Sequence, residues 1–339
     1  GGYMATAIND FIQGIIMLFG IIAVIAAVIH SKGGFMSALQ GLANVSDPAV
    51  SDTPGIFASF FGPDPFNLLC VVILTSLGTW GLPQMVQKFY AIDNEASIQK
   101  GTVISTIFAL IVSGGCYFLG GFGRLFSDQI DVKANGFDSI IPTMLSNLSP
   151  ALIALVVILV LSASMSTLSS LVIASSSTLT IDFLKDNFIK NMSDKKQVLY
   201  IRILVVVFIA ISAILALIQY KSSVTFIAQL MGISWGALAG SFLAPFMFSL
   251  YSKKVSKASC WACFLFSSVL MIANIFFRAG FPTWLQSPIN CGAFAMFAGM
   301  IIVPVVSLFT PKPDKELVDS AFACYEKETE VPQKTALGK

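Results

Sequence analysis

The stretch ASMSTLSSLVIASSSTLT, residues 163–180, places a ladder of hydroxyls inside an apolar segment long enough to cross a bilayer. Its small and hydroxyl residues recur at spacings of three and four, so they share one face of a helix. Lipid offers no hydrogen bonds, so these hydroxyls must bond back to their own helix, face another helix or coordinate something hydrated. Close helix packing and ion coordination both fit this pattern. The stripe consists of Ser166, Thr167, Ser170, Ala174, Ser177 and Thr178.

The composition indicates a polytopic membrane protein. With 56% hydrophobic residues, 11% charged residues and a mean hydropathy of +0.83, the chain departs far from soluble domains, in which about 25% of residues are charged. Apolar segments of about 20 residues or more, the length that a hydrocarbon core requires, occur eight times. We therefore expect an all-α protein that crosses the lipid bilayer about eight times. The predicted spans are Ala5–Ile29, Phe66–Phe89, Thr102–Phe122, Leu148–Leu179, Tyr200–Gln219, Thr225–Leu250, Ala258–Phe277 and Cys291–Phe309.

The basic residues predict how these spans are oriented. An even number of spans returns both termini to one side of the membrane, and cytoplasmic connections carry an excess of Lys and Arg. Of the 20 Lys and Arg residues, 15 lie on the side of the termini and five lie opposite. We therefore expect a multi-pass protein of the plasma membrane with both ends of this chain in the cytoplasm. The net charge of +2 reflects this bias, and no basic stripe points to nucleic acid.

Segments outside the spans suggest the domain organisation. The chain does not begin with Met and runs almost directly into a span, so we expect it to be the later part of a longer protein. Residues 30–64, rich in Gly, Ser, Asp and Pro, are expected to form an external loop. Residues 310–339 alternate charges without apolar periodicity, which is typical of a mobile end. We predict a transmembrane domain over 1–309 and a cytoplasmic tail over 310–339.

Asp10 is the clearest ionisable residue inside a predicted span. A charge in lipid is costly and usually functional, and Gln13 follows on the same helical face. Two interpretations remain open. The carboxylate either reaches the interface or caps the helix start, or it lies on an ion path.

The second span is interrupted in its middle by Gly78, Gly81 and Pro83. Proline removes one backbone hydrogen bond and clashes with the carbonyl four residues back, which favours a break in the helix. Broken helices at mid-membrane expose backbone groups to substrate and ions in secondary transporters. A simple proline kink is the alternative. In the sixth span, a series of small residues is expected to form a helix contact. These residues are Gly232, Gly236 and Gly240.

The chain shows no sign of covalent chemistry. It contains neither a nucleophile elbow, nor a Walker loop, nor a paired-carboxylate constellation, which argues against an intramembrane hydrolase or an ATP-driven pump. We therefore expect that the protein is not an enzyme.

Four segments together resemble the sodium:solute symporter family, which includes proline, pantothenate and sugar carriers. Residues 1–13 resemble the family's entry to its sixth helix, and residues 81–89 are similar to a segment of the proline and pantothenate branch. Residues 163–169 match the most diagnostic segment of the family, and Asp182 to Lys185 follow it as in the family. The resemblance covers nearly all of the chain through Phe309.

The resemblance implies a sodium site. It assigns the backbone oxygen of Ala163 and the hydroxyls of Ser166 and Thr167 to the coupling sodium ion, completed by oxygens from a first core helix that precedes this chain. It associates Asp10 with sodium release toward the cytoplasm. Such a site suits sodium, because hard cations take oxygen ligands without fixed geometry and must later leave.

The resemblance also implies a solute site on the second span. Thr79, Trp80 and Gln84 are the candidate neighbours of the solute. Where the proline carriers place aromatic residues, this sequence has Thr75 and Thr79, which argues against proline itself as the solute.

The resemblance implies an inverted-repeat fold of the five-plus-five type. The chain would contain the last helix of the first repeat, all of the second repeat and two extra helices, with the N-terminal helices of the same protein as its partner. We expect a sodium-coupled symporter that imports a small organic solute by alternating access. The alternative is a membrane solute sensor of the same fold that does not transport.

Overall fold

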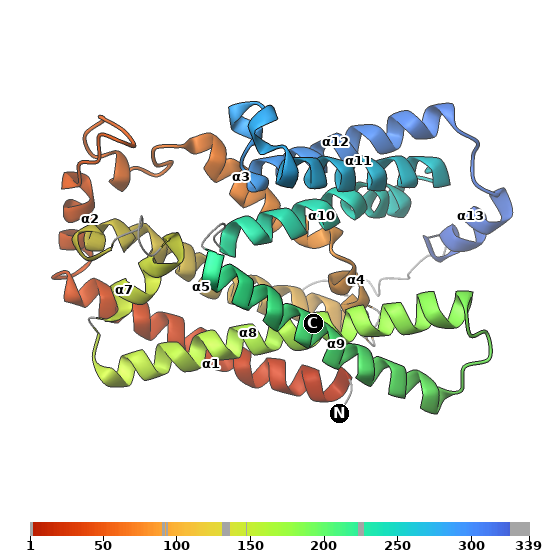
Figure 1. Ribbon diagram of the computed structural model, residues 1–339, viewed down its shortest axis with the longest axis horizontal. Helices are drawn as coiled ribbons and strands as arrows, with labels where there is room; N and C mark the ends of the chain where they lie inside the picture. Colours follow the sequence, from red (N-terminus) through yellow and green to blue (C-terminus); the bar gives the residue numbers. More distant parts are fainter. Residues whose placement is uncertain are drawn as a thin grey trace, which may run out of the picture. The chain divides into compact units, whose positions relative to one another are not determined.

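The computed structural model describes residues 3–89, 92, 94–130, 136–146, 148–222 and 227–325, and within these ranges the chain is helical with no β-strand. In the described part of the chain, seven helices are long and apolar enough to cross a membrane, and Figure 1 labels each of them. They are α1 (Tyr3–Ser31), α5 (Glu95–Gly121), α8 (Pro150–Thr178), α9 (Asp194–Ser222), α10 (Ile227–Tyr251), α11 (Lys257–Phe276) and α12 (Pro288–Phe309). The shorter helices are α2 (Phe35–Asn44), α3 (Pro65–Ser76), α4 (Pro83–Phe89), α7 (Ile140–Ser146) and α13 (Lys315–Phe322). The prediction of an all-α membrane protein is confirmed.

The remaining predicted span, Phe66–Phe89, is broken, as its glycines and proline indicated. Helix α3 ends at Ser76, a short 3-10 turn covers Gly78–Gly81, and α4 begins at Pro83. Leu82 between them is extended, with φ −87° and ψ 117°, because a residue before proline is pushed out of the helical region. Proline suits the first position of α4, where its missing N–H costs nothing. The span is therefore a true break and not a simple kink.

The helices form two compact units. The first comprises residues 1–65 and 86–227, and the second comprises residues 66–85 and 228–339.

In the first unit, α1 packs against α8 and α5. The buried face of α1 carries Ile21, Val24 and Val28 at helical spacing. Gly20 lets α8 approach closely, because a Cβ at this position would lie 2.6 Å from Cδ1 of Leu159. The helix that carries the hydroxyl stripe is thus packed directly on the helix that carries Asp10.

The predicted external loop, residues 30–64, has more structure than its composition suggested. It contains α2, which begins after Gly33 and Gly34, two glycines with φ of 81° and 99° that other residues rarely adopt. The Arg124 guanidinium lies 2.9 Å from Asp47 and stacks 4.0 Å over the ring of Phe57. These contacts join the loop to the segment that follows α5.

In the second unit, the glycines of α10 bring three helices together, as the small-residue series predicted. A Cβ on Gly236 would lie 2.7 Å from the Cα of Gly292 on α12, and a Cβ on Gly232 would meet Ile289 at 2.9 Å. The hydroxyl of Ser267 on α11 donates to the carbonyl of Gly236 at 3.3 Å. Backbone approaches this close are possible only with small residues at the crossing.

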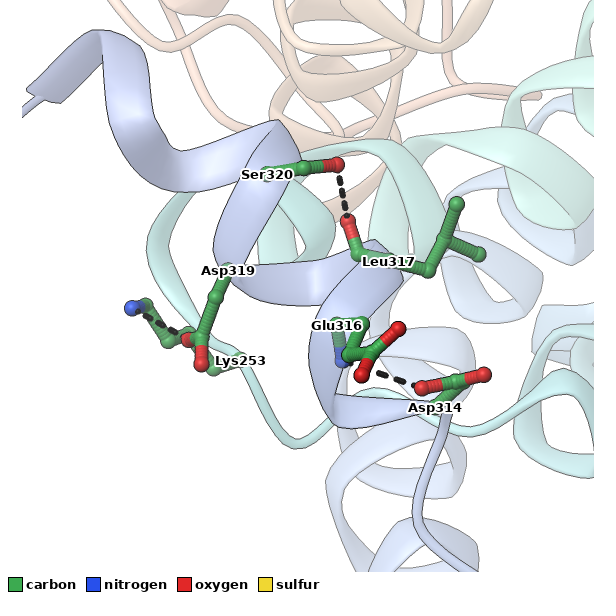
Figure 2. Close-up of polar contacts among 6 residues, drawn as sticks. All are labelled: Lys253, Asp314, Glu316, Leu317, Asp319 and Ser320. Carbon is green, nitrogen blue, oxygen red and sulfur yellow. Dashed lines mark hydrogen bonds and ion pairs between the residues drawn. The ribbon is translucent and has the colours of Figure 1, made fainter.

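The tail contains a short helix that its sequence did not indicate. Helix α13 is capped by the Asp314 carboxylate, which accepts a hydrogen bond from the N–H of Glu316 (Figure 2). The Lys253 ammonium donates to Asp319 at 2.9 Å, and this bond lowers the pKa of the Asp319 carboxyl. Residues 315–322 of the tail thus form a helix that a cap and an ion pair support.

Candidate functional site

The predicted hydroxyl stripe lies on one face of α8. Of the buried residues of this helix, Val172 and Ser176 lie away from the stripe, whereas Ser162 borders it, four residues before Ser166. The stripe itself is half-buried or exposed, and Thr167 is among its exposed members. By helical spacing the stripe continues the face of Val156 and Leu159, which pack against the core of the first unit.

Most hydroxyls of the stripe bond back to their own helix. The Ser166 hydroxyl donates to the carbonyl of Ala163 at 3.0 Å, and the Ser177 hydroxyl donates to the carbonyl of Ala174 at 2.9 Å. The Ser170 hydroxyl donates to the carbonyls of Ser166 and Thr167. Back-bonding, which belongs to the interpretation as close helix packing, thus describes these serines.

Thr167 differs from these serines, because its hydroxyl makes no hydrogen bond with any part of the chain that the structure describes. The Ala163 carbonyl and the Ser166 hydroxyl already lie side by side at 3.0 Å. A cation could take both of these oxygens if the Ser166 proton turned away, which would give up one hydrogen bond with a net worth of about 0.5–1.5 kcal/mol. The three oxygens can therefore serve a weakly held cation.

Asp10 and Gln13 present unpaired oxygens on α1. Asp10 Oδ1 and Gln13 Oε1 are both buried, and neither accepts a hydrogen bond from the described residues. A buried acceptor without a donor costs free energy, more so when it is charged. Because the two residues are three apart, their oxygens lie on the same helical face. Such a pair suits a hydrated cation or ordered water better than it suits packing.

The structure packs the helix of Asp10 on the helix of the stripe, but no hydrogen bond among the described residues joins Asp10 to Ser166 or Thr167. A groove of about 310 Å³ in this unit is lined by Asn9 from α1 and by Met165 and Ser169 from α8. By helical spacing, Met165 and Ser169 lie on the flank opposite the stripe. This groove is mostly apolar, and the stripe does not line it.

The candidate solute residues surround the break in the second span. Trp80 is 59% exposed, and Thr79 and Gln84 are half-buried. The Thr79 hydroxyl donates to the carbonyl of Ser76 at 2.7 Å. Two glycines anchor the turn, since Gly78 and Gly81 are buried against α10. At the break, Trp80 is therefore exposed, whereas Gly78 and Gly81 hold the turn against α10.

The candidate sodium residues and the candidate solute residues belong to different compact units. Ala163, Ser166, Thr167 and Asp10 lie in the first unit, whereas Thr79, Trp80 and Gln84 lie in the second.

One polar pair on α8 escaped the analysis of the sequence. Ser176 and Thr180 are fully buried, and the described residues provide no hydrogen-bond partner for either hydroxyl. Thr180 lies in a π-helical stretch, Leu179–Lys185, that continues α8. Ser176 and Thr180 are four residues apart, a spacing that the sequence shows. The stripe residues come from the same segment at similar spacings, so spacing alone did not single out this pair.

Comparison with known proteins identifies relatives of one kind. Residues 1–265 match the sodium:solute symporter family. The high-affinity proline transporter of Bacillus subtilis is 26% identical over 321 residues, which cover 94% of this chain and 64% of that protein. The sodium/pantothenate symporter of Haemophilus influenzae is 26% identical over 261 residues, 76% of this chain and 51% of that protein.

A sodium/proline symporter of Staphylococcus aureus is 27% identical over 334 residues, which cover 92% of this chain and 60% of that protein. The chain thus spans less than two thirds of the length of each of these relatives. All three are named as transporters or symporters, and none is named as an enzyme.

Proposed function

Because this chain belongs to the sodium:solute symporter family, we propose that the full-length protein is a sodium-coupled symporter that imports a small organic solute by alternating access. Sodium moving down its gradient supplies the free energy, and no covalent step is involved. The observation that carries the proposal is the oxygen set on α8 in a member of this family. It comprises the Ala163 carbonyl and the Ser166 hydroxyl, 3.0 Å apart, and the hydroxyl of Thr167, the next residue of the helix.

The oxygen set fits the task of a coupling ion. A carbonyl and two hydroxyls bind a hard cation without a buried carboxylate, so the ion can be released on the low-sodium side. Further oxygens for the same ion are proposed to come from N-terminal helices of the same protein. The unpaired Asp10 and Gln13 oxygens are proposed to form the path along which sodium leaves toward the cytoplasm.

The solute is proposed to contact Thr79, Trp80 and Gln84 at the break. Relatives named for proline and for pantothenate suggest a small organic anion or zwitterion. Thr75 and Thr79 in place of aromatic residues argue against proline. The direct test is uptake of labelled amino acids, monocarboxylates and vitamins into proteoliposomes that contain the full-length protein. We expect at least one solute to enter with an inward sodium gradient and not with an equal potassium gradient. Uptake that is equal in the two gradients would contradict the proposal.

The fold is proposed to be an inverted repeat of the five-plus-five type over a transmembrane domain of residues 1–309, with a cytoplasmic tail over 310–339. In this scheme α1 is the last helix of the first repeat. The broken span α3–α4 opens the second repeat, at the kind of position where broken helices form the central sites of such carriers. The rest of that repeat is α5, α8, α9 and α10, and α11 and α12 are extra helices.

The orientation is proposed from the 15-to-5 distribution of basic residues. In a full-length protein freed of its native cysteines, Asp194→Cys should resist impermeant thiol reagents in intact cells, whereas Asp52→Cys should react. Both positions are exposed, so burial cannot explain a difference between them. The reverse pattern of labelling would overturn the orientation and the direction assigned to Asp10.

Replacing the Asp10 carboxylate tests the release path. We expect Asp10→Asn to lower the maximal uptake rate at least about tenfold, because a neutral amide stabilises a leaving cation less than a carboxylate does. Asn9→Ala changes the neighbouring residue, which lines the apolar groove, and should leave the rate within about twofold. Initial uptake rates at saturating sodium measure both. Equal rates for Asp10→Asn and the parent protein would remove Asp10 from the path.

A further inference from the structure

A groove of about 400 Å³ in the second unit is lined by residues of α10 and α11. Its wall is aromatic, with Phe242 from α10 and with Trp261 and Phe264 from α11. The ring centroids of Phe242 and Phe264 are 5.9 Å apart, and those of Trp261 and Phe264 are 5.7 Å apart at nearly right angles. Three rings from two helices thus form one continuous apolar surface on membrane-spanning segments.

One end of this groove is cationic. Lys257 lines the groove and is the first residue of α11, so it lies where that helix begins. Lys254 precedes it in a connection, residues 252–256, that contains no acidic residue. Lys253 is already paired with Asp319. Neither Lys254 nor Lys257 has a carboxylate partner in the part of the chain that the structure describes.

Ser241 lines the groove in its deeper part and carries hydrogen-bonding groups without partners in the described part of the chain. Ser241 is only 2% exposed, and its hydroxyl has no partner among the described residues. Pro245 has no N–H to give to the carbonyl four residues back, so the Ser241 carbonyl also lacks its helical donor. Groups of this kind are costly in an apolar site unless a ligand or water satisfies them.

We propose that this groove binds an anionic glycerophospholipid from the leaflet on the side of Lys257. The groove has a cationic end and an apolar wall, as the lipid has an anionic headgroup and acyl chains. The Lys257 ammonium meets the phosphate, and the rings of Phe242, Trp261 and Phe264 cover an acyl chain. A basic pocket between helices at a membrane surface attracts acidic lipids, and the interface is where Trp is enriched.

The probe is phosphatidylglycerol with a photoreactive diazirine in its acyl chain, compared with the same diazirine in phosphatidylcholine. Full-length protein in phosphatidylcholine nanodiscs is irradiated with each probe, and adducts on residues 241–245 and 257–264 are mapped by mass spectrometry. We expect at least about fivefold more adducts from phosphatidylglycerol, because only this lipid has a net negative charge for Lys257 to attract.

Two charge variants and one conservative variant decide the assignment. Lys257→Gln should reduce the phosphatidylglycerol adducts to the level of phosphatidylcholine, and Lys257→Arg should restore them. Lys254→Gln removes the same charge three residues away without touching the groove, and should leave the preference intact. Equal labelling by the two probes in the unmodified protein would overturn the proposal, as would a preference that Lys257→Gln does not change. Lys257 is exposed, so its replacement should leave the protein folded.

Discussion

Replacement of Ser166 and Thr167 together by Ala is expected to raise the sodium concentration for half-maximal uptake at least about tenfold, equivalent to about 1.4 kcal/mol of binding free energy. The two hydroxyls are the side-chain ligands in the oxygen set on α8 that is proposed to bind sodium. The double variant keeps only the Ala163 carbonyl of that set. Sodium titration of initial solute uptake by the full-length protein measures the effect. The loss should appear as a shift in sodium dependence at normal expression, because the two side chains are not fully buried.

The matched control for this variant is Ser164→Ala with Ser169→Ala, which removes two hydroxyls from the same helix outside the stripe. The Ser169 hydroxyl donates to the carbonyl of Met165 at 2.6 Å. Removing it therefore breaks a hydrogen bond within α8, as removing the Ser166 hydroxyl does. The control should keep its sodium dependence within about twofold. Equal shifts in the two double variants would assign the effect to α8 in general and would refute the sodium set.

The substitution Gly81→Ala is expected to destabilise the folded protein by about 1–3 kcal/mol. The 3-10 turn in the second span lies so close to α10 that a Cβ on Gly81 would be 2.9 Å from the Cα of Ala239 and from the backbone N of Leu243. Backbone atoms cannot move aside as a flexible side chain can, so the turn or α10 must shift. The midpoint of thermal unfolding in detergent should fall, together with the yield of monodisperse protein.

Gly78 provides the control within the same turn. A Cβ on Gly78 would meet the Cβ of Ala239 and the Sδ of Met296 at 3.6 Å, which is ordinary contact. Gly78→Ala should therefore leave the unfolding midpoint nearly unchanged. If the two variants behaved alike, Gly81 would not be the residue that fixes the turn on α10, and the placement of Thr79 and Trp80 beside it would lose its support.

The positions of the spans were predictable from the sequence because a backbone inside the bilayer can adopt few conformations. Apolar length predicts the helices, since a backbone in lipid must satisfy its own hydrogen bonds. The break before Pro83 was predictable for the same reason, because proline removes one of those bonds. The glycines of α10 also predicted their close crossings, as small residues at spacings of four are hard to explain otherwise.

Helices outside the membrane were not predictable in this way. Helix α13 depends on the Asp314 cap and on the ion pair between Lys253 and Asp319. These two residues are 66 positions apart, and local periodicity cannot predict a contact over such a separation. Helix α2 likewise lies in a segment whose Gly, Ser and Pro content predicts a loop.

The candidate site was predictable only in its residue types. Spacing placed Ser166 and Thr167 on one face, but spacing could not distinguish a back-bonded serine from an open hydroxyl. The structure makes that distinction, since Ser166 bonds to Ala163 while Thr167 has no partner among the described residues. The unpaired oxygens of Asp10 and Gln13 required the packing of α1, which a pattern of residues does not contain.

The central claim is that sodium and solute cross the membrane together, and the most direct measurement is the flux of sodium itself. Proteoliposomes containing the full-length protein are loaded with sodium-free buffer and placed in ²²Na⁺, and a transported solute from the uptake panel is then added outside. We predict that the solute accelerates ²²Na⁺ entry, and that the protein with Ser166→Ala and Thr167→Ala loses this acceleration at the same sodium concentration. Solute that enters without accelerating ²²Na⁺ entry would contradict the account.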